Sequence, residues 1–516
     1  MRFVSYSALF AIAAAIATVE IGRAETNTND DLLASFQNPP AKARPRTWWH
    51  WLSGNVSREG ITKDLEWMTR IGLGGAQVFD GDMGAPQVVE RRVAALSPEW
   101  RANMKFAASE ADRLGLEFAM AAAPGWSETG GPWVKPEAAM KKVVWSETRI
   151  KGSGKSFQLV APPSVAGPFQ DIPLGGEAWG HHVEIPSLYR DIAVLAFKAP
   201  KGDFAEYDLK PKMSANVDVT GLERLMDGDL TVGAELPDPR PDSPVWIQYS
   251  FDAPQSIRAL KLVGPLTGRY VTGPNGYLQV SDNGGNWINV VSLVGAGQTP
   301  APQRTFSFPA VTGTRFRVIF DSPAVSREPW GKPSGISIKE LVLVPGARVN
   351  YFEDKAGFGV AYRPDQTPTS GYSAAETVSP EGVIDLTDRL ASDGMLKWSP
   401  PPGDWVVLRI GCSLTGKTNH PATPEATGLE VDKLDADHVR LHLESYILPL
   451  VKEFGPLAGE RGLQYILTDS WEAGVQNWTG SMVAEFKKRR RYDPRPFLPV
   501  LTGRIVGSPE QSDDFL

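Results

Sequence analysis

Residues 47–81 read TWWHWLSGNVSREGITKDLEWMTRIGLGGAQVFDG, and this stretch decides the fold. Residues 47–52 form a short apolar and aromatic run that predicts a buried strand, and residues 76–80 predict a second one. Between them, Ser57 precedes apolar residues at helical spacing from Ile61 to Ile71, and glycines then end the helix. The order strand, helix, strand predicts a βα unit of a parallel sheet.

The same pattern continues and later returns. Ser97 and a following proline predict the start of a helix over residues 98–114, and residues 116–122 predict a third strand. Further along, the pattern predicts strands at residues 405–411 and 463–468 and helices at Asp435–Val451 and Ser481–Arg490. These are five strands of an α/β barrel, whereas a complete (β/α)8 barrel has eight. We therefore expect either part of a longer protein or an irregular barrel.

The chain between these two regions has a different pattern. From residue 146 to about 350, short β-rich runs alternate with Gly, Pro, Asp and Asn, which is typical of a β-sandwich. A further β-rich segment covers residues 351–400. The predicted fold class is α/β plus all-β: a (β/α)8-type barrel, formed by residues 25–145 and 401–516, interrupted by a β-sandwich insertion.

Composition and charge exclude several classes of protein. The 516 residues are 42% hydrophobic and 22% charged, as in ordinary globular proteins. The net charge of −7 disfavours nucleic-acid binding, which usually relies on a basic domain. Cys412 is the single cysteine, so neither an intrachain disulfide nor a cysteine-based zinc cluster can form.

The N-terminus has the pattern of a secretory signal peptide over residues 1–24. Arg2 supplies a positive charge, residues 4–19 are apolar, and the small residues Gly22 and Ala24 form a cleavage site. The alternative is a membrane anchor, but the apolar run is shorter than the roughly 20 residues that a span needs. We therefore expect a periplasmic or secreted protein without a transmembrane segment in its mature form.

The strongest candidate for chemistry is residues 463–478, LQYILTDSWEAGVQNW. A predicted strand is followed at once by Asp469, Trp471 and Glu472, and the carboxyl ends of barrel strands build active sites. A neighbouring tryptophan would raise the pKa of a glutamic acid and keep it protonated for donation to a leaving oxygen. The alternative is that Asp469 caps the next helix and Glu472 interacts with its dipole.

Other predicted strand ends also carry polar and aromatic residues. His50 on the first strand points either to the barrel mouth or into the core. Asp80 binds hydroxyls or a cation, or belongs to a turn. Trp126 and Glu128 lie in PGWSETGGPW (124–133). Glycines in this loop allow a ligand to approach, and a tryptophan side chain can stack on a sugar ring. The alternative is that Trp126 and Trp133 pack the loop itself.

The polar loop at residues 411–434, GCSLTGKTNHPATPEATGLEVDKL, supplies further candidates for hydroxyl contacts. These candidates are Asn419, His420, Glu430, Asp432 and Lys433, and the alternative is a solvated loop. His438 and His442 have the spacing of zinc ligands on a helix, but the glutamate of an HExxH motif is missing, which favours a solvated helix face.

Four motifs in the same order resemble the glycoside hydrolase family 106 α-L-rhamnosidases. They are WWHWLSGNVSREGITKDLEWMTRIGLGGAQVFDG, APGWSETGGPW, GKTNHPATPEATGLEVDKL and TDSWEAGVQNW. The resemblance covers residues 45–135 and about 400–505. It implies an inverting exo-glycosidase on a (β/α)8 barrel with β-sandwich insertions, and a calcium ion near the sugar site.

The resemblance also implies roles for single residues. Glu472 matches the first catalytic glutamate of the family and is expected to be the general acid, although acid and base could be exchanged. Asp469 is expected to orient the substrate or to be linked to calcium, and Trp478 of the same motif is a candidate for sugar contact. The second family glutamate lies well beyond Leu516, so we expect this chain to be an N-terminal portion.

Residues 220–345 separately resemble galactose-binding-like modules, through LMDGDLTVG, VWIQYSFDAPQSIRALKLV and SDNGGNWINV. The expected partner of the protein is a rhamnose-containing glycan or glycoside. Two alternatives remain: a glycan-binding protein without catalysis, and a glycosidase for another deoxyhexose.

Overall fold

The computed structural model describes residues 29–151, 157–162, 186–203, 208–264, 275–281, 285–293, 303–322, 336–359, 364–369, 371–468, 471 and 473–516. The proposed signal peptide, Asp469 and Glu472 lie outside the described residues. In the part of the chain that is described, no helix is both long and apolar enough to span a bilayer.

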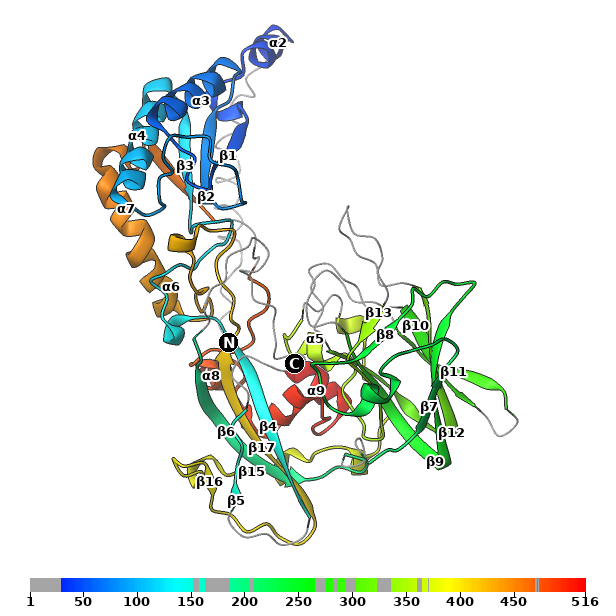
Figure 1. The fold of residues 1–516 in the computed structure, drawn as a ribbon. Helices are drawn as coiled ribbons and strands as arrows, with labels where there is room; N and C mark the ends of the chain where they lie inside the picture. Colours follow the sequence, from blue (N-terminus) through cyan, green and yellow to red (C-terminus); the bar gives the residue numbers. More distant parts are fainter. Residues whose placement is uncertain are drawn as a thin grey trace, which may run out of the picture.

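A four-stranded parallel sheet lies at one end of the molecule (Figure 1). Its strands, in spatial order, are β1 (Arg46–Leu52), β2 (Gly75–Gly81), β3 (Glu117–Ala121) and β18 (Leu463–Leu467). Sequence patterns predicted all four. The last strand joins a segment far along the chain to the first three, so the intervening residues form an insertion between β3 and β18.

The helices α3 (Arg58–Arg70) and α4 (Pro98–Leu114) begin at the predicted serines. The Ser57 hydroxyl accepts a hydrogen bond from the Gly60 amide, and the Ser97 hydroxyl accepts one from the Trp100 amide. Both helices pack on one face of the parallel sheet, where Trp49, Trp51, Leu65 and Trp100 are part of a single core. Each cap contributes about 1 kcal/mol to its helix.

The other face of the parallel sheet is open among the described residues. Trp48 and Tyr465 are each 55% exposed, and a cavity of about 320 Å³ lies beside Gln77 and Ala119. Within the described chain, no strand pairs with the outer edge of β1 or of β18, so a closed barrel is not seen. The confirmed fold class is therefore the coarser one, mixed α/β with many strands.

One predicted barrel strand belongs to a different sheet. β17 (Asp404–Leu414) runs antiparallel to β4 (Lys141–Lys151) and β6 (Tyr189–Lys198), and β15 (Ile384–Asp385) completes the order β15-β6-β17-β4. The assignment of residues 405–411 to the barrel was therefore wrong. A continuous apolar run indicates a strand buried on both faces, but it carries no information on the direction of the neighbouring strands.

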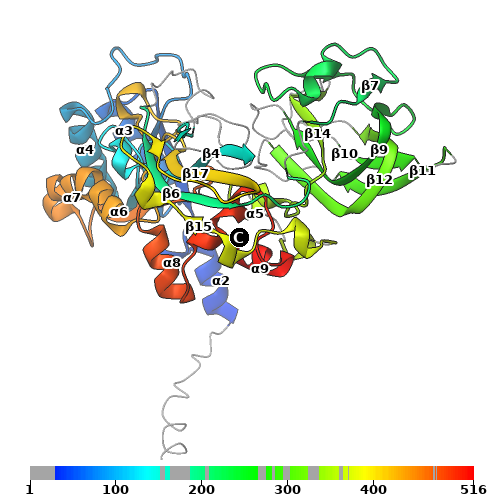
Figure 2. The same cartoon turned by 90° about the horizontal axis from the view of Figure 1, so that it is seen from below.

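A third unit, here called the β module (residues 208–344), lies on the far side of the molecule from the parallel sheet (Figures 1 and 2). Its six-stranded antiparallel sheet consists of β7 (Lys212–Ala215), β9 (Val245–Val263), β10 (Asn275–Ser281), β11 (Trp287–Leu293), β12 (Gln303–Ser322) and β14 (Glu340–Val344). β8 (Ala234–Leu236) pairs with β13 (Ile336–Ile338), and one core lies between these elements.

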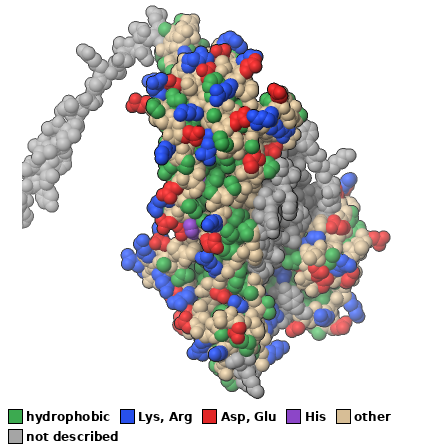
Figure 3. All heavy atoms as spheres, turned by 60° about the vertical axis from the view of Figure 1, so that its left-hand side comes forward, with side chains coloured by type: hydrophobic (Ala, Val, Ile, Leu, Met, Phe, Trp, Pro, Cys, Tyr) green, Lys and Arg blue, Asp and Glu red, His purple; other side chains and the backbone are tan. Residues whose placement is uncertain are grey.

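The remaining elements are short. They are α2 (Asn29–Gln37), β5 (Phe157–Gln158), α5 (Phe352–Lys355), β16 (Met395–Leu396), α6 (Ala436–His442), α7 (Leu448–Phe454), α8 (Met482–Arg490) and α9 (Pro509–Phe515). The predicted helix Asp435–Val451 is present as α6 and α7, joined by a π-helical turn at residues 443–447. Basic and acidic side chains are mixed over the helix-covered face that Figure 3 shows.

A buried ion cluster joins the antiparallel sheet to the C-terminal segment. The Arg504 guanidinium donates to the Asp203 carboxylate at 2.9 Å and to the Glu147 carboxylate at 2.7 Å. Arg348 forms an ion pair with the other oxygen of Asp203, also at 2.9 Å. Despite the burial of the carboxyl group, Arg504 and Arg348 hold the pKa of Asp203 at about 2.

Candidate active site

Three loops meet at the carboxyl-terminal edge of the parallel sheet. The Gly125 amide donates to the Asp80 carbonyl at 2.7 Å, and the Trp126 amide donates to the His420 carbonyl at 2.9 Å. Gly125 has φ of 80°, and a Cβ atom there would lie 2.7 Å from the His420 carbonyl group. Only glycine therefore allows the loop after β3 and the loop after β17 to approach so closely.

A buried carboxylate and a lysine form the centre of the site. One Glu430 oxygen, Oε2, accepts hydrogen bonds from the Thr129 hydroxyl and the Lys433 ammonium, both at 2.7 Å. The other oxygen, Oε1, is buried and has no hydrogen-bond partner among the described residues. The Lys433 ammonium also lies 5.0 Å from the centre of the Trp471 ring. This contact joins the loop after β17 to the stretch that follows β18.

Asp432 has a different role from the hydroxyl contact predicted for it. Its side chain is completely buried and accepts from Lys141 Nζ at 3.1 Å, from Thr479 Oγ1 at 2.9 Å and from the side-chain amide of Gln476. The Leu434 amide also donates to it. Because these donors occupy both carboxylate oxygens, Asp432 holds the loop in place instead of facing a substrate.

Asn419 is likewise a positioning residue. Its amide nitrogen donates to the carbonyls of Pro124 and Ala426, each at 3.0 Å, and its amide oxygen accepts from the Gly428 amide at 2.8 Å. The neighbouring His420 is buried, and its Nδ1 atom lies 3.2 Å from the Thr418 carbonyl. The prediction of direct sugar contact by Asn419 is corrected, because its amide is committed to the loop.

His50 lies on the sheet face opposite the helices. Its ring stacks on Phe79, with 5.5 Å between ring centres, and meets Trp126 edge-on at 6.0 Å. Nε2 is buried without a hydrogen-bond partner among the described residues, and burial lowers the pKa of His50. Burial therefore favours the neutral imidazole, and the Trp126 ring is close enough to contact the same ligand.

Asp80 is the most perturbed carboxyl group at this edge of the sheet. Oδ2 accepts a hydrogen bond from the Trp100 indole at 2.7 Å, while Oδ1 is buried and has no partner among the described residues. Burial raises the pKa of Asp80 to about 7; the Trp100 hydrogen bond opposes this, and Glu425 and Asp82 add to it. Perturbed groups of this kind cluster at functional sites.

The substitution Asp80→Asn is expected to change how stability depends on pH. Because the folded pKa is raised, Asp80 favours the folded state most below the unfolded pKa of about 4, and this contribution is lost as the pH rises to about 7. The loss is of the order of 4 kcal/mol. Urea unfolding at several pH values should show the variant gaining stability relative to the wild type over this range. A stability difference between the variant and the wild type that stays constant with pH would contradict the raised pKa of Asp80.

The remaining candidates lie in contrasting surroundings. Glu128 is half-buried in the loop after β3, whereas Trp478 is buried in the core beneath the antiparallel sheet, which corrects its predicted sugar contact. Trp133 also packs inside, stacked on Tyr446 with 5.2 Å between ring centres. His442 is buried and its Nε2 atom lies 2.9 Å from the Ala122 carbonyl, so the predicted solvated helix face is wrong at this position.

Sequence reasoning missed the residues that hold the buried carboxylates of the site in place. Thr129, Lys141 and Gln476 hold the two buried carboxylates. Thr129 and Gln476 lie within two of the quoted motifs but were not singled out there, and Lys141 lies outside the motifs. The sole signal was their position inside the quoted loops or next to them. Among the described residues, no three His, Cys, Asp or Glu side chains converge as a metal site.

Comparisons with known proteins show the family of the chain. The model of the α-L-rhamnosidase family, glycoside hydrolase family 106, matches residues 37–516. A solved rhamnosidase from Novosphingobium sp. PP1Y is 39% identical with a TM-score of 0.77, over 94% of this chain and 44% of that chain. A curated protein of Formosa agariphila, described as a putative β-glucuronidase, is 29% identical over 94% of this chain and 28% of its own length.

The chain belongs to glycoside hydrolase family 106, as the four motifs predicted. It spans less than half the length of either relative.

Proposed function

We propose that the chain acts in the hydrolysis of terminal α-L-rhamnose from glycans or glycosides. The observation that carries the proposal is the buried Glu430 carboxylate, which has one oxygen without a partner among the described residues, beside Lys433 and Trp471 in a chain of this family. A carboxylate oxygen and an ammonium group together bind neighbouring sugar hydroxyls, one accepting and the other donating.

The proposed reaction is an inverting displacement. Glu472, which follows Trp471 directly, protonates the leaving oxygen, and a second carboxylate activates water on the opposite face of the sugar. Inversion places the two carboxyl groups roughly 6.5–9.5 Å apart, which leaves room for that water. Asp469 orients the substrate, and Trp126 and His50 form an apolar wall of the sugar site.

The first test is hydrolysis of p-nitrophenyl α-L-rhamnoside, with the anomer of the released sugar read by NMR and rhamnose binding read by calorimetry. Turnover with release of the β-anomer supports the proposal. Binding without turnover favours a glycan-binding protein, and turnover of another aryl deoxyhexoside instead favours a different glycosidase. Preference for an aryl β-glucuronide would assign to this chain the activity in its relative's description.

Glu430→Gln is expected to lower kcat/KM for the rhamnoside about 10- to 100-fold, mainly through KM. The change removes the negative charge that fixes Lys433 and weakens the acceptor for a sugar hydroxyl; hydrogen bonds to charged groups are worth about 1.5–3 kcal/mol. The exposed Glu460 provides the matched control, and Glu460→Gln should leave both constants unchanged. Equal effects of the two substitutions would contradict a role for Glu430 in binding.

We also propose calcium as a ligand of the protein, because the family resemblance implies it. Calcium takes six to eight oxygen ligands, and the described side chains do not assemble such a set on their own. No step of the proposed reaction is therefore assigned to the ion. Calorimetric titration of chelator-treated protein tests it: calcium that binds and raises Tm supports the proposal, and no heat of binding contradicts it.

Fold and export complete the proposal. The open face of the parallel sheet, with Trp48 and Tyr465 exposed, fits a sheet that continues into a (β/α)8 barrel, since parallel sheets are normally covered on both faces. A crystal structure of a longer chain without a strand beside β1 or β18 would contradict this.

We propose that the β module is a galactose-binding-like sandwich. Export through residues 1–24 predicts a mature periplasmic or secreted protein that begins at Glu25 on N-terminal sequencing.

A further inference from the structure

The outer face of the β module carries an unusual group of side chains. Along β9, β10 and β12 alternate residues such as Ile247, Val280 and Phe316 are buried in the core. The residues between them, among them Trp246 and Arg317, therefore point to the opposite face, because side chains alternate along a strand. This face belongs to the largest sheet of the module and lies far from the candidate active site (Figure 1).

Arg317 is at the centre of this face. Its Nε and Nη2 atoms donate to the Gln279 side-chain oxygen at 3.1 and 2.6 Å. The guanidinium carbon lies 4.1 Å from the centre of the Trp287 ring and 5.8 Å from that of Trp246. The two rings and the glutamine fix the orientation of the guanidinium group, so little conformational freedom is left for a ligand to remove.

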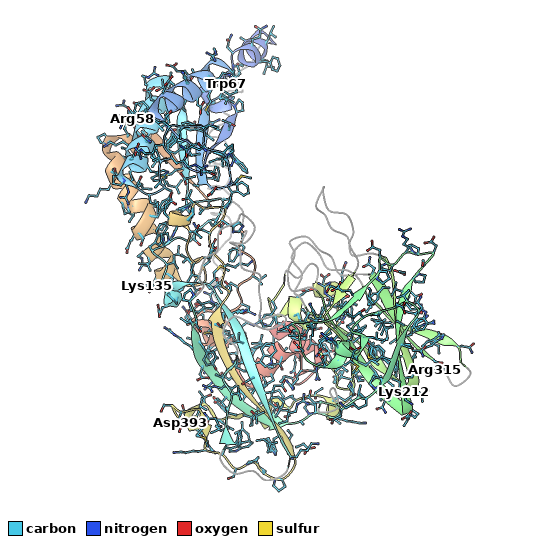
Figure 4. All side chains as sticks on the ribbon, in the orientation of Figure 1. Arg58, Trp67, Lys135, Lys212, Arg315 and Asp393 are labelled. Carbon is cyan, nitrogen blue, oxygen red and sulfur yellow. The ribbon has the colours of Figure 1, made fainter. Side chains whose placement is uncertain are left out.

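The positive charge of Arg317 is not neutralised within the described part of the chain. Among the described residues it has no carboxylate partner, and its Nη1 atom has no hydrogen-bond partner. Arg315 lies 5.8 Å from the centre of the same Trp287 ring and donates to the Ser281 hydroxyl at 3.0 Å, without an ion pair in the described chain. On β7, Lys212 is opposite Ser250 in the same sheet and forms an exposed ion pair with Asp252 at 3.8 Å. Figure 4 labels Lys212 and Arg315 on this module.

We propose that this Trp–Arg face, made of Trp246, Trp287, Arg315, Arg317 and Gln279, binds an acidic polysaccharide through its carboxylate or sulfate groups. The free edge of the Arg317 guanidinium offers two parallel N–H donors, the arrangement that suits a planar or tetrahedral oxyanion. Indole rings pack against the C–H faces of sugars. The Gln279 amide, whose nitrogen donates to the Asn289 side chain at 2.8 Å, holds the Arg317 guanidinium in place.

Charge complementarity favours an acidic glycan over a nucleic acid. The protein as a whole carries −7, so a polyanion with one charge per roughly 1.7 Å, such as duplex DNA, is repelled outside this small basic area. A polysaccharide places its charges one sugar apart and between hydroxyl groups. Because the face is remote from the candidate active site, it would hold the enzyme on a polymer without occupying the catalytic centre.

Calorimetry on the full chain tests the proposal with three saccharides: oligogalacturonate for carboxylates, sulfated dextran oligomers for sulfates, and neutral dextran. We expect binding to one or both acidic saccharides and none to neutral dextran. Arg317→Ala should weaken that binding at least about tenfold, because losing a hydrogen bond to a charged group typically reduces affinity by at least this factor. The stronger of the two acidic ligands identifies which anion the face prefers.

Arg224→Ala is the matched control, because it removes the same charge from a segment that packs on the core side of the module. An equal loss of binding in this variant would mean attraction by net charge alone and would overturn the proposal. Failure of the wild type to bind either acidic saccharide, or equally tight binding of single-stranded DNA, would also overturn it. If Arg317→Ala does not fold, Arg315→Ala, which changes an exposed side chain, is tested in its place. It should likewise weaken binding of the acidic saccharide at least about tenfold. The readout is binding, so the result is independent of hydrolysis.

Discussion

Glu472→Gln is expected to lower the rate of hydrolysis of alkyl α-L-rhamnosides by about 10²–10⁴-fold, the usual contribution of a general acid. Glutamine has the shape of glutamic acid, but its amide N–H protons are not acidic enough to be transferred to the leaving oxygen. The effect should be much smaller for a dinitrophenyl rhamnoside, whose leaving group departs without protonation. The ratio of the two effects is the measurement, because it separates a general acid from a general base.

A matched control makes this experiment selective. Glu460→Gln changes an exposed glutamate just before β18 and should leave both substrates unaffected. If Glu472→Gln slows both substrates equally, Glu472 acts as the base and the two roles are exchanged. If it slows neither, the assignment from the DSWEAG motif is wrong, and Glu430 becomes the first carboxylate to examine.

Arg504→Ala is expected to lower the free energy of unfolding by about 3–5 kcal/mol. Arg504 is buried and donates to both Asp203 and Glu147. Its removal leaves Asp203 buried with only the charges of Arg348 and Arg149 near it among the described residues. Denaturant unfolding gives the value. The control is Arg440→Ala, which breaks an exposed pair with Asp437 and should cost less than about 1 kcal/mol.

The same cluster predicts a pH dependence. Asp203 has a folded pKa of about 2 despite its burial, below its unfolded value near 3.9, so its contribution is present above pH 4 and is lost as the pH falls through 2. The contribution is about 2–3 kcal/mol. The stability difference between wild type and Asp203→Asn should therefore shrink as the solution is acidified. A difference that grows on acidification would show that the folded pKa of Asp203 is not lowered.

Local sequence information was sufficient for the helices and strands around the site. Ser57 and Ser97 are at the predicted helix starts, and α4 covers the predicted residues 98–114. Caps and apolar spacing act within a few residues, so they can be recognised without knowledge of the rest of the chain. The family could also be recognised, because its motifs are short and contiguous.

Burial could not be predicted in the same way. Asn419, Asp432 and Trp478 were candidates for substrate contact because their residue types suit sugars, yet all three are committed to internal packing or hydrogen bonds. The residue type states which bonds a side chain can make, whereas the surrounding fold decides which partners reach it first.

The order of amino acids was enough to specify the βα units, the family and the position of the carboxylates along the chain, because these depend on contacts between near neighbours and on contiguous motifs. Long-range packing was needed to show that β17 leaves the parallel sheet, and that Thr129 meets Glu430 across 301 residues. It was also needed to show that an arginine between two tryptophans faces outward on the β module. Strand pairing and burial are set by competition among distant segments for the same partners, and no local pattern records the outcome of that competition.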